Sequence, residues 1–301
     1  MLAILVIQIC NYVNYKGEIH MKRIMQTTLA LAIVMTFGVV TVKAQELEEI
    51  IGIALFERSA RQVRLTQFGR VFETRAREIL RASDDLSDLA RASQSQLTGQ
   101  LRLGFIPTIA PYLLPKFIAN MQRSHREIEL NIRETLTPRL IQELSDGRID
   151  AAVVALPVNE AAFTEVDLFE EKFVLIRPVT DAQKPVPNAD MLRDLRLLLL
   201  EEGHCFRDQA LAYCTVRTSR AWEGLDGSSL STLVQMVGAG MGVTLLPQMA
   251  IAVETRAAKV DVVEFEGRAP SRRIGMIWRK SNPLAEQLHH VAQVVRLSAE
   301  R

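Results

Sequence analysis

Two of the three cysteines stand close together in the chain, and their spacing limits the redox chemistry they can do. Cys205 and Cys214 are nine positions apart. Peroxide oxidises a cysteine thiolate to a sulfenic acid, which a second thiol converts to a disulfide. Within one helix, nine residues rise about 13 Å, whereas a disulfide needs Cα atoms within about 7 Å. Either the two cysteines are unrelated, or bonding them requires the segment to unwind.

The pattern around Cys205 predicts a strand followed by a helix. An apolar run at 195–200 is typical of a buried strand, Gly203 predicts a turn, and the composition from 207 to 213 favours a helix. At such a junction, helix amides and a nearby arginine would lower the pKa of the thiol and raise its thiolate fraction. His204 and Cys205 lack a second Cys or His pair at zinc-site spacing, so we expect no metal and no cofactor.

Length and composition are those of a globular protein, with 301 residues, 48% of them apolar and 24% charged. A net charge of +1 gives the chain as a whole no signal for nucleic acid or membrane. A local signal for nucleic acid exists, because the segment from 58 to 81 contains seven arginines and only two acidic residues, Glu73 and Glu78. These arginines are Arg58, Arg61, Arg64, Arg70, Arg75, Arg77 and Arg81.

Residues 1–44 differ from the rest of the chain. A basic start at Met21, Lys22 and Arg23 precedes an uncharged stretch at 24–42 and small residues up to Ala44. This order is typical of a secretory signal peptide that begins at Met21, and the alternative is a buried or membrane helix. We therefore expect Met21 to be the true start, and N-terminal sequencing of the product would test this.

Three patterns describe the body of the chain. Apolar residues recur at three- and four-residue steps from 68 to 92, which predicts a long helix whose narrow stripe suits a helix partner or its own domain. From 97 onward strand and helix patterns alternate, which predicts an α/β fold with parallel sheets covered on both faces. The glycines at 238–242 follow a helix and precede a strand, which favours a helix end and tight turn over a dinucleotide site.

Several motifs resemble one family, the LysR-type transcriptional regulators, and the resemblance runs from about 45 to 301. Leu55-Phe56-Glu57-Arg58-Ser59, followed by Leu65-Thr66, resembles the wing of that family. The segment from Gly203 to Ala210, together with Cys214 nine residues after Cys205, resembles the family's peroxide-sensing members. This motif is specific to them. Supporting segments at 104–108 and 240–247 are weaker, and the latter marks only the wider family.

The resemblance implies an architecture for the whole chain. The fold class is α/β, with a periplasmic-binding-protein-like effector of two α/β subdomains, at 99–169 plus 273–301 and at 170–272. A linker and dimerisation helix at 67–96 would precede the effector. A partial winged-helix remnant would occupy 45–66, behind the unrelated leader at 1–44.

The resemblance also implies roles for particular residues. Cys205 would be the sensing and Cys214 the resolving cysteine. The residues implied around the thiolate and peroxide are Thr108, His204, Asp208 and Arg272, with Arg273 as the alternative to Arg272. Without the resemblance, Thr108 reads as a helix N-cap and His204 as a core residue. The residues expected at the DNA backbone are Arg58, Arg61 and Arg64.

The implied function is a peroxide-sensing transcription regulator, not an enzyme, with a reversible Cys205–Cys214 disulfide. The implied partners are promoter DNA, hydrogen peroxide, a homodimer or homotetramer, a thioredoxin- or glutaredoxin-type reductant, and RNA polymerase. The implied location is the cytoplasm, or the inner membrane or periplasm if residues 21–44 act as a signal. Because only the end of the recognition helix, at 46–50, precedes the wing, the alternative is a DNA-blind redox-sensing or ligand-binding effector module.

Overall fold

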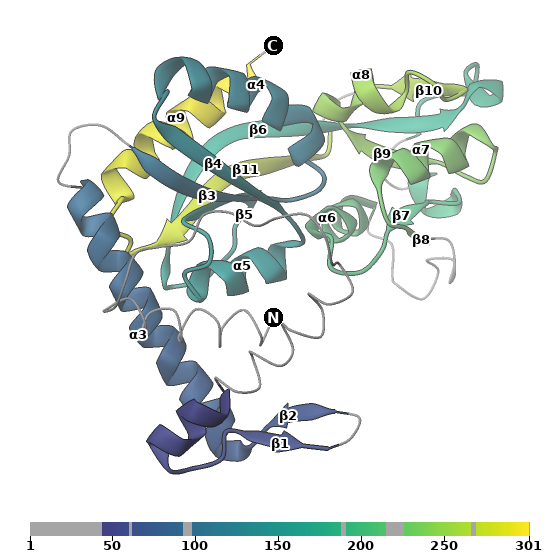
Figure 1. Ribbon diagram of the computed structural model, residues 1–301. Helices are drawn as coiled ribbons and strands as arrows, with labels where there is room; N and C mark the ends of the chain where they lie inside the picture. Colours follow the sequence, from purple (N-terminus) through teal and green to yellow (C-terminus); the bar gives the residue numbers. More distant parts are fainter. Residues whose placement is uncertain are drawn as a thin grey trace, which may run out of the picture. The chain divides into compact units, whose positions relative to one another are not determined.

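The computed structural model describes residues 44–59, 62–92, 98–187, 191–214, 226–265 and 269–300. The signal-like segment predicted from Met21 and the basic residue Arg61 lie outside the described residues, apart from Ala44. The chain divides into two compact units, residues 1–84 and 85–301 (Figure 1).

The first unit contains a short helix at 44–51 and a hairpin of β1 (Phe56–Arg58) and β2 (Val63–Leu65), which pair antiparallel. The Glu48 carboxylate accepts hydrogen bonds from the backbone amides of Leu55 and Phe56 at 2.7 and 2.8 Å. These bonds tie the helix to the hairpin. The helix end and the short wing-like strands predicted from the sequence are therefore confirmed.

The long helix predicted at 68–92 is confirmed as α3 (Gln67–Ala92). Thr66 begins it, because its hydroxyl oxygen accepts a hydrogen bond from the Gly69 amide at 2.9 Å. Several large apolar side chains of α3 are exposed, and they are Phe68, Val71, Ile79, Leu86 and Leu89. The helix therefore offers an apolar stripe to a partner, as its spacing indicated.

The second unit alternates strands and helices (Figure 1). Its strands are β3 (Gly99–Phe105), β4 (Ile128–Glu134), β5 (Ala151–Leu156), β6 (Phe163–Pro178), β7 (Leu199–Leu200), β8 (Asp226–Gly227), β9 (Thr244–Pro247), β10 (Val260–Val263) and β11 (Ser271–Arg279). Its α-helices are α4 (Ala110–Ser124), α5 (Thr137–Ser145), α6 (Cys205–Cys214), α7 (Leu230–Gly238), α8 (Ile251–Glu254) and α9 (Ala285–Ala299). Short 3₁₀ helices are η1 (Val179–Asp181), η2 (Met191–Asp194) and η4 (Gln248–Ala250).

The main sheet is mixed, so the prediction of parallel sheets is wrong for this part of the fold. The strand order is β10-β6-β11-β5-β3-β4, and β9 also pairs with β6. β3 runs parallel to β4 and β5, whereas β11 is antiparallel to both β5 and β6. The reason is the path of the chain: β6 leads out of the first half of the unit and β11 leads back into it.

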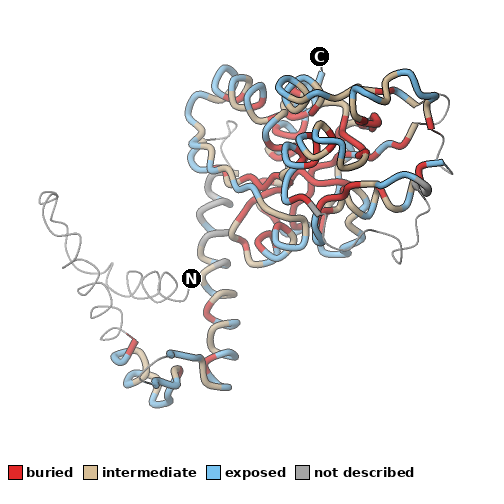
Figure 2. The backbone as a smooth tube through the Cα atoms, turned by 90° about the vertical axis from the view of Figure 1, so that its right-hand side faces the viewer, coloured by how far each residue is buried: buried red, intermediate tan, exposed pale blue. Residues whose placement is uncertain are grey.

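Two hydrophobic cores lie along β6, and they define two subdomains. Phe163 and Leu168 of β6 belong to the core of subdomain I, together with β3, β5, β11, α4 and α9. Residues 173–176 of β6 belong to the core of subdomain II, together with β9, α6 and α7. In Figure 2 the buried segments follow the strands, while exposed segments lie on the outer faces of the helices.

Helices cover both faces of the sheet in subdomain I. α4 and α9 lie together on one face and α5 lies on the other (Figure 1). Asn120 of α4 donates a hydrogen bond to the Ser298 hydroxyl of α9 at 2.9 Å, which joins the two helices.

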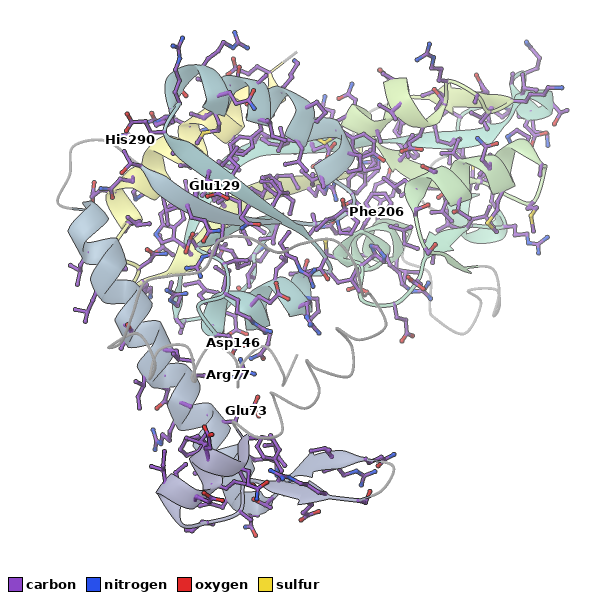
Figure 3. The ribbon with its side chains drawn as sticks, viewed as in Figure 1. Glu73, Arg77, Glu129, Asp146, Phe206 and His290 are labelled. Atoms are coloured by element: carbon purple, nitrogen blue, oxygen red, sulfur yellow. The ribbon has the colours of Figure 1, made fainter. Side chains whose placement is uncertain are left out.

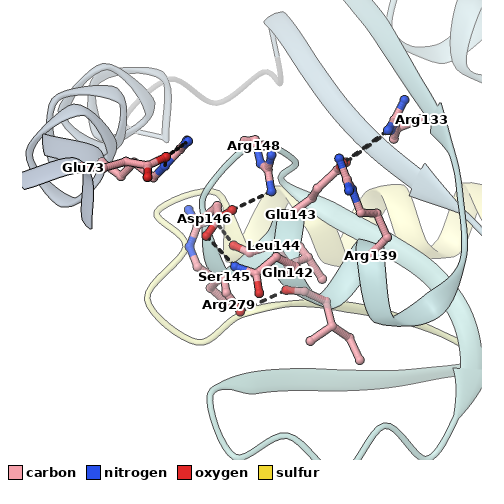
Figure 4. Close-up of polar contacts among 12 residues, drawn as sticks. Glu73, Arg133, Arg139, Gln142, Glu143, Leu144, Ser145, Asp146, Arg148 and Arg279 are labelled. Atoms are coloured by element: carbon pink, nitrogen blue, oxygen red, sulfur yellow. Dashed lines mark hydrogen bonds and ion pairs between the residues drawn. The ribbon is translucent and has the colours of Figure 1, made fainter. Parts of the chain in front are cut away.

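Ion pairs hold α5 in place, as Figure 4 shows. Glu143 is buried and accepts from Arg139 at 3.1 Å, with Arg133 at 3.3 Å on its other side. The carbonyl of Leu144 accepts from Arg279 of β11 at 2.8 Å. Asp146, labelled in Figure 3, pairs with a neighbouring arginine beyond the helix end. These contacts anchor the last turn of α5, whereas the residues that precede its first turn border the site described below.

The glycine segment after α7 is a helix end and tight turn, as predicted. Gly240 adopts φ +79° with open space around it, whereas a Cβ on Gly242 would lie 2.3 Å from the Arg196 carbonyl oxygen. We expect Gly242→Ala to lower the free energy of unfolding more than Gly240→Ala, which should cost about 1 kcal/mol. Chemical denaturation of both variants tests this order, and equal losses would contradict it.

Candidate redox site

Cys205 lies at the junction of a strand and a helix, as the sequence predicted. β7 ends at Leu200, and Gly203 turns the chain with φ +94°. α6 then begins at Cys205, whereas the composition alone indicated a helix from Arg207. The guanidinium of Arg207 donates to the Leu200 carbonyl at 2.7 Å, so the helix is tied back to the strand.

The turn before Cys205 fits closely against the start of α5. A Cβ on Gly203 would lie 3.0 Å from a methyl carbon of Leu136. The side chain of Cys205 is half-buried, is a free thiol, and packs against the core of subdomain I although α6 belongs to subdomain II. The thiol therefore lies where the two subdomains meet.

Arg272 forms the centre of a buried ionic group at this boundary. Its side chain is 0% exposed and that of Glu171 is 4% exposed, with 2.7 Å between guanidinium nitrogen and carboxylate oxygen. The guanidinium also donates to the Thr108 hydroxyl at 2.8 Å and to the Thr108 carbonyl at 3.1 Å. Glu171 therefore balances the charge of Arg272, and Arg272 orients Thr108.

Thr108 is not the N-cap that its position suggested. α4 begins only at Ala110, and its N-cap Ile109 offers no side-chain hydrogen bond. Instead Thr108, a residue that is 2% exposed, accepts a hydrogen bond from Arg272 through its hydroxyl oxygen. Because its oxygen accepts a bond from a cation, its own proton can be donated to a further oxygen atom.

Two aromatic rings cover the guanidinium of Arg272. Its central carbon lies 5.7 Å from the Phe173 ring centre and 5.5 Å from that of Phe206, and the two rings are 4.9 Å apart. Phe206 follows Cys205 directly and is labelled on α6 in Figure 3. The cation–π contacts therefore connect the start of α6 to the buried ionic group.

A pocket of about 350 Å³ opens beside this group. Its walls come from both subdomains, and among its lining residues are Thr108, Tyr112, Thr135, Glu201, His204 and Glu254. His204 is buried as the core alternative suggested, yet it also borders the pocket. Burial lowers its pKa, and the opposing effect of the Glu201 carboxylate is smaller, so its imidazole is neutral at pH 7.

The pKa of His204 implies a pH dependence of stability. The unfolded chain binds this proton with a pKa of about 6.5, while the folded protein binds it less tightly. Stability should therefore fall as the pH drops below about 6.5, by about 1.4 kcal/mol for each pKa unit of difference. Urea unfolding between pH 7.5 and 5 should show a smaller fall for His204→Gln. The pKa of His125 is also lowered by burial, so the corresponding His125→Gln variant is a matched control. If the stability of His204→Gln fell with pH as steeply as that of the unmodified protein, the role given to His204 would be contradicted.

The other predicted residues lie apart from the buried group. Asp208 is exposed in the first turn of α6, and Cys214 ends that helix, with its side chain outside the described residues. Arg273 is exposed and pairs with Asp167 at 3.1 Å, so it does not replace Arg272. In the other unit, Arg58 lies in β1 and bonds Glu48, and Arg64 is exposed in β2.

Sequence reasoning missed several residues of the site. Glu171 is 101 positions from Arg272, and Tyr112 bonds Glu254 from 142 positions away, so no local pattern could reveal either pair. Gln209 could have been found, because it lies one turn after Cys205 on the same side of a helix. Its carboxamide oxygen is buried without a hydrogen-bond partner among the described residues.

The described residues contain neither a metal-binding cluster nor a membrane-spanning helix. Within them, no group of three or more His, Cys, Asp or Glu side chains is placed to hold a metal ion. None of the helices in the same ranges is long and apolar enough to cross a membrane.

The chain folds into two subdomains with a pocket between them. Comparison with known proteins identifies the family to which this fold belongs. Residues 94–299 match the LysR substrate binding domain. The chain belongs to the LysR family of transcriptional regulators.

Within that family, several of the relatives carry names that refer to hydrogen peroxide. A probable hydrogen peroxide-inducible genes activator from Streptomyces viridosporus is 38% identical over 89% of this chain and 87% of the relative. The DNA-binding transcriptional dual regulator OxyR of Escherichia coli is 34% identical over 84% of this chain and 83% of its own length.

Solved structures show the same likeness. A full-length OxyR cysteine-to-aspartate mutant from Pseudomonas aeruginosa aligns with a TM-score of 0.69 and 34% identity, over 87% of this chain and 86% of that one. An H2O2-bound OxyR cysteine-to-serine mutant from Corynebacterium glutamicum aligns with a TM-score of 0.67 and 31% identity, over 87% and 83%. The resemblance stated from the motifs is confirmed.

Proposed function

We propose that this chain is a peroxide-responsive transcription regulator in which Cys205 is the sensing residue. The observation that carries the proposal is the setting of Cys205, a free thiol at the start of α6 whose neighbour Phe206 packs on the buried Arg272. The relatives named as peroxide-inducible activators support it. The H2O2-bound relative supports peroxide itself as the ligand.

The first chemical step needs a thiolate and a proton donor. The Cys205 thiolate attacks one oxygen of hydrogen peroxide, an S–O bond forms, and the O–O bond breaks. The product is a sulfenic acid, and the departing hydroxide takes up a proton to become water. Thr108 can donate its hydroxyl proton in a hydrogen bond to the departing oxygen, because Arg272 occupies the hydroxyl's acceptor side. The unpartnered Gln209 oxygen can accept a bond from the peroxide.

The second step makes the signal. The thiol of Cys214 attacks the sulfenic sulfur, which forms the disulfide and releases water. Because both cysteines lie in the one helix α6, their Cα atoms are about 13 Å apart along its axis and the helix must unwind. Unwinding would pull Phe206 away from Phe173 and Arg272, so oxidation would disturb the contact between the subdomains.

The partners follow from the surfaces of the first unit and from the redox cycle. The exposed apolar stripe of α3 suits a homodimer or homotetramer. The hairpin arginines Arg58 and Arg64 would contact DNA phosphates, which positions the protein without reading sequence. A thioredoxin- or glutaredoxin-type reductant would reset the disulfide, and RNA polymerase would receive the signal. This reset favours the cytoplasm over the periplasm, where the disulfide would persist.

A mobility-shift assay on a peroxide-response promoter tests the regulatory role. At moderate salt, the reduced and the peroxide-treated full chain should both retard the promoter fragment, with different mobility or footprint length. Cys205→Ser should give the reduced pattern under both conditions. A peroxide-dependent change that persists in Cys205→Ser would contradict the role of this residue.

A second candidate function is a DNA-blind redox-sensing or ligand-binding module. The uncharged stretch at 24–42, where the family has helix-turn-helix residues, favours it. The same assay decides, because this candidate predicts no specific shift together with normal oxidation of Cys205. We do not propose an enzyme, and sustained catalytic consumption of peroxide in the presence of a reductase, at rates typical of a peroxidase, would contradict that view.

A further inference from the structure

Tyr112 links the two subdomains at the wall of the pocket. It lies in the first turn of α4, a helix of subdomain I, yet its ring packs against the core of subdomain II. Its phenol donates a hydrogen bond to one carboxylate oxygen of Glu254 at 2.7 Å. The second oxygen of Glu254 accepts from the Ser231 hydroxyl at 2.5 Å. Glu254 ends α8 and Ser231 lies in α7, so one carboxylate joins three helices.

This link lies in the wall of the pocket described above. Tyr112, Glu254 and Ser231 line the pocket together with Thr108 and His204. Thr108 precedes Tyr112 by four residues, and the intervening turn is held by a hydrogen bond from the Tyr112 amide to the Ile109 carbonyl at 3.1 Å. Tyr112 and Thr108 are therefore joined by a short, hydrogen-bonded segment.

The phenol of Tyr112 is a reliable donor. Burial raises its pKa above the ordinary value of about 10, and the hydrogen bond and charge of Glu254 raise it further. The Arg272 charge opposes this to a smaller degree, and the Glu171 charge adds to it. The phenol therefore stays protonated across the physiological pH range, and the link to Glu254 persists.

We propose that Tyr112 is a positioning residue for the reaction of Cys205 with peroxide, because its bond to Glu254 fixes the separation of the two subdomains. The inference rests on the proposed function. Thr108 comes from subdomain I and Cys205 from subdomain II, so the distance between the proton donor and the thiolate depends on how firmly the subdomains are held. An error of about 1 Å in such a geometry can cost on the order of a hundredfold in rate.

The test compares two reagents at the same sulfur. Hydrogen peroxide needs both the thiolate and the Thr108 donor, whereas iodoacetamide needs only an accessible thiolate. In Tyr112→Phe, which removes one hydroxyl, the peroxide rate constant at Cys205 should fall about tenfold. The iodoacetamide rate constant should not fall. Both are measured on the full chain by quenched labelling and peptide mass.

Two matched variants refine the test. Ser231→Ala keeps the bond between Tyr112 and Glu254 but removes one of the two hydrogen bonds to the carboxylate, so its peroxide rate should fall less than that of Tyr112→Phe. Glu254→Gln keeps an acceptor for the phenol without its charge, so its peroxide rate should fall less than that of Tyr112→Phe. It also provides a second measurement if Tyr112→Phe does not fold.

The outcomes separate the inference from the proposed function. Equal loss of both rate constants in Tyr112→Phe, or no loss of either, overturns the positioning role while Cys205 remains the sensor. An unmodified protein whose Cys205 fails to react with peroxide overturns the proposed function, and the inference with it.

Discussion

Replacing Arg272 with alanine is expected to lower the free energy of unfolding by about 3–5 kcal/mol, the largest loss of stability among the changes considered for this fold. The reason is the carboxylate that stays behind. Glu171 is 4% exposed and would lose its ion pair at 2.7 Å, so a buried charge would remain without a counter-charge. Thr108 would lose its hydrogen bond, and Phe173 and Phe206 would lose the cation between them.

Chemical denaturation of the full chain measures this loss, with Cys205→Ser in both proteins to prevent oxidation. A double variant, Arg272→Met with Glu171→Gln, is the matched control. It removes both charges and keeps an acceptor for the Met249 amide, so it should be more stable than the single variant. A loss below about 1 kcal/mol in Arg272→Ala would show that the pair is not the structural centre proposed here.

The largest expected effect on activity is that of Cys205→Ser, which should abolish rapid oxidation by peroxide. A serine hydroxyl is hardly ionised at neutral pH and cannot form the sulfenic acid. The remaining cysteines, Cys10 and Cys214, should then react no faster than ordinary free thiols, of which about 3% are thiolate at pH 7. The rate is measured by stopped flow with a peroxide-specific probe.

Cys214→Ser is the matched control for that variant. It should oxidise at Cys205 as fast as the unmodified protein, but its product should be a sulfenic acid instead of a disulfide. If Cys214→Ser lost the rapid phase as well, Cys205 would not be acting as the first nucleophile alone.

Local patterns predicted the parts of this molecule that local chemistry determines. The junction before Cys205 and the turn at 238–242 are both visible as short runs of residues. A local contact of the same kind begins α7, where the Ser229 hydroxyl accepts from the Thr232 amide at 3.2 Å. The position of Cys205 at the start of α6 follows from Gly203 and needs no distant partner.

Long-range pairings were not predictable in the same way. The first half of β6 cannot be recognised from the sequence, because polar and apolar residues do not alternate regularly from Phe163 to Lys172. These residues form a strand because β11 pairs with them from a hundred positions away. The pair of Arg272 with Glu171 and the pair of Tyr112 with Glu254 are contacts of the same kind. The folding of the chain brings these residues together, and their spacing in the sequence does not predict it.

Peptide mapping with intact mass, after one equivalent of peroxide on the full chain, tests directly whether Cys205 and Cys214 form a disulfide. We expect a loss of two hydrogens confined to a linked pair of peptides containing Cys205 and Cys214. Cys205→Ser should show no such loss, and a thioredoxin-type reductant should reverse it. A stable sulfenic acid at Cys205 with an unmodified Cys214 would contradict the two-cysteine switch.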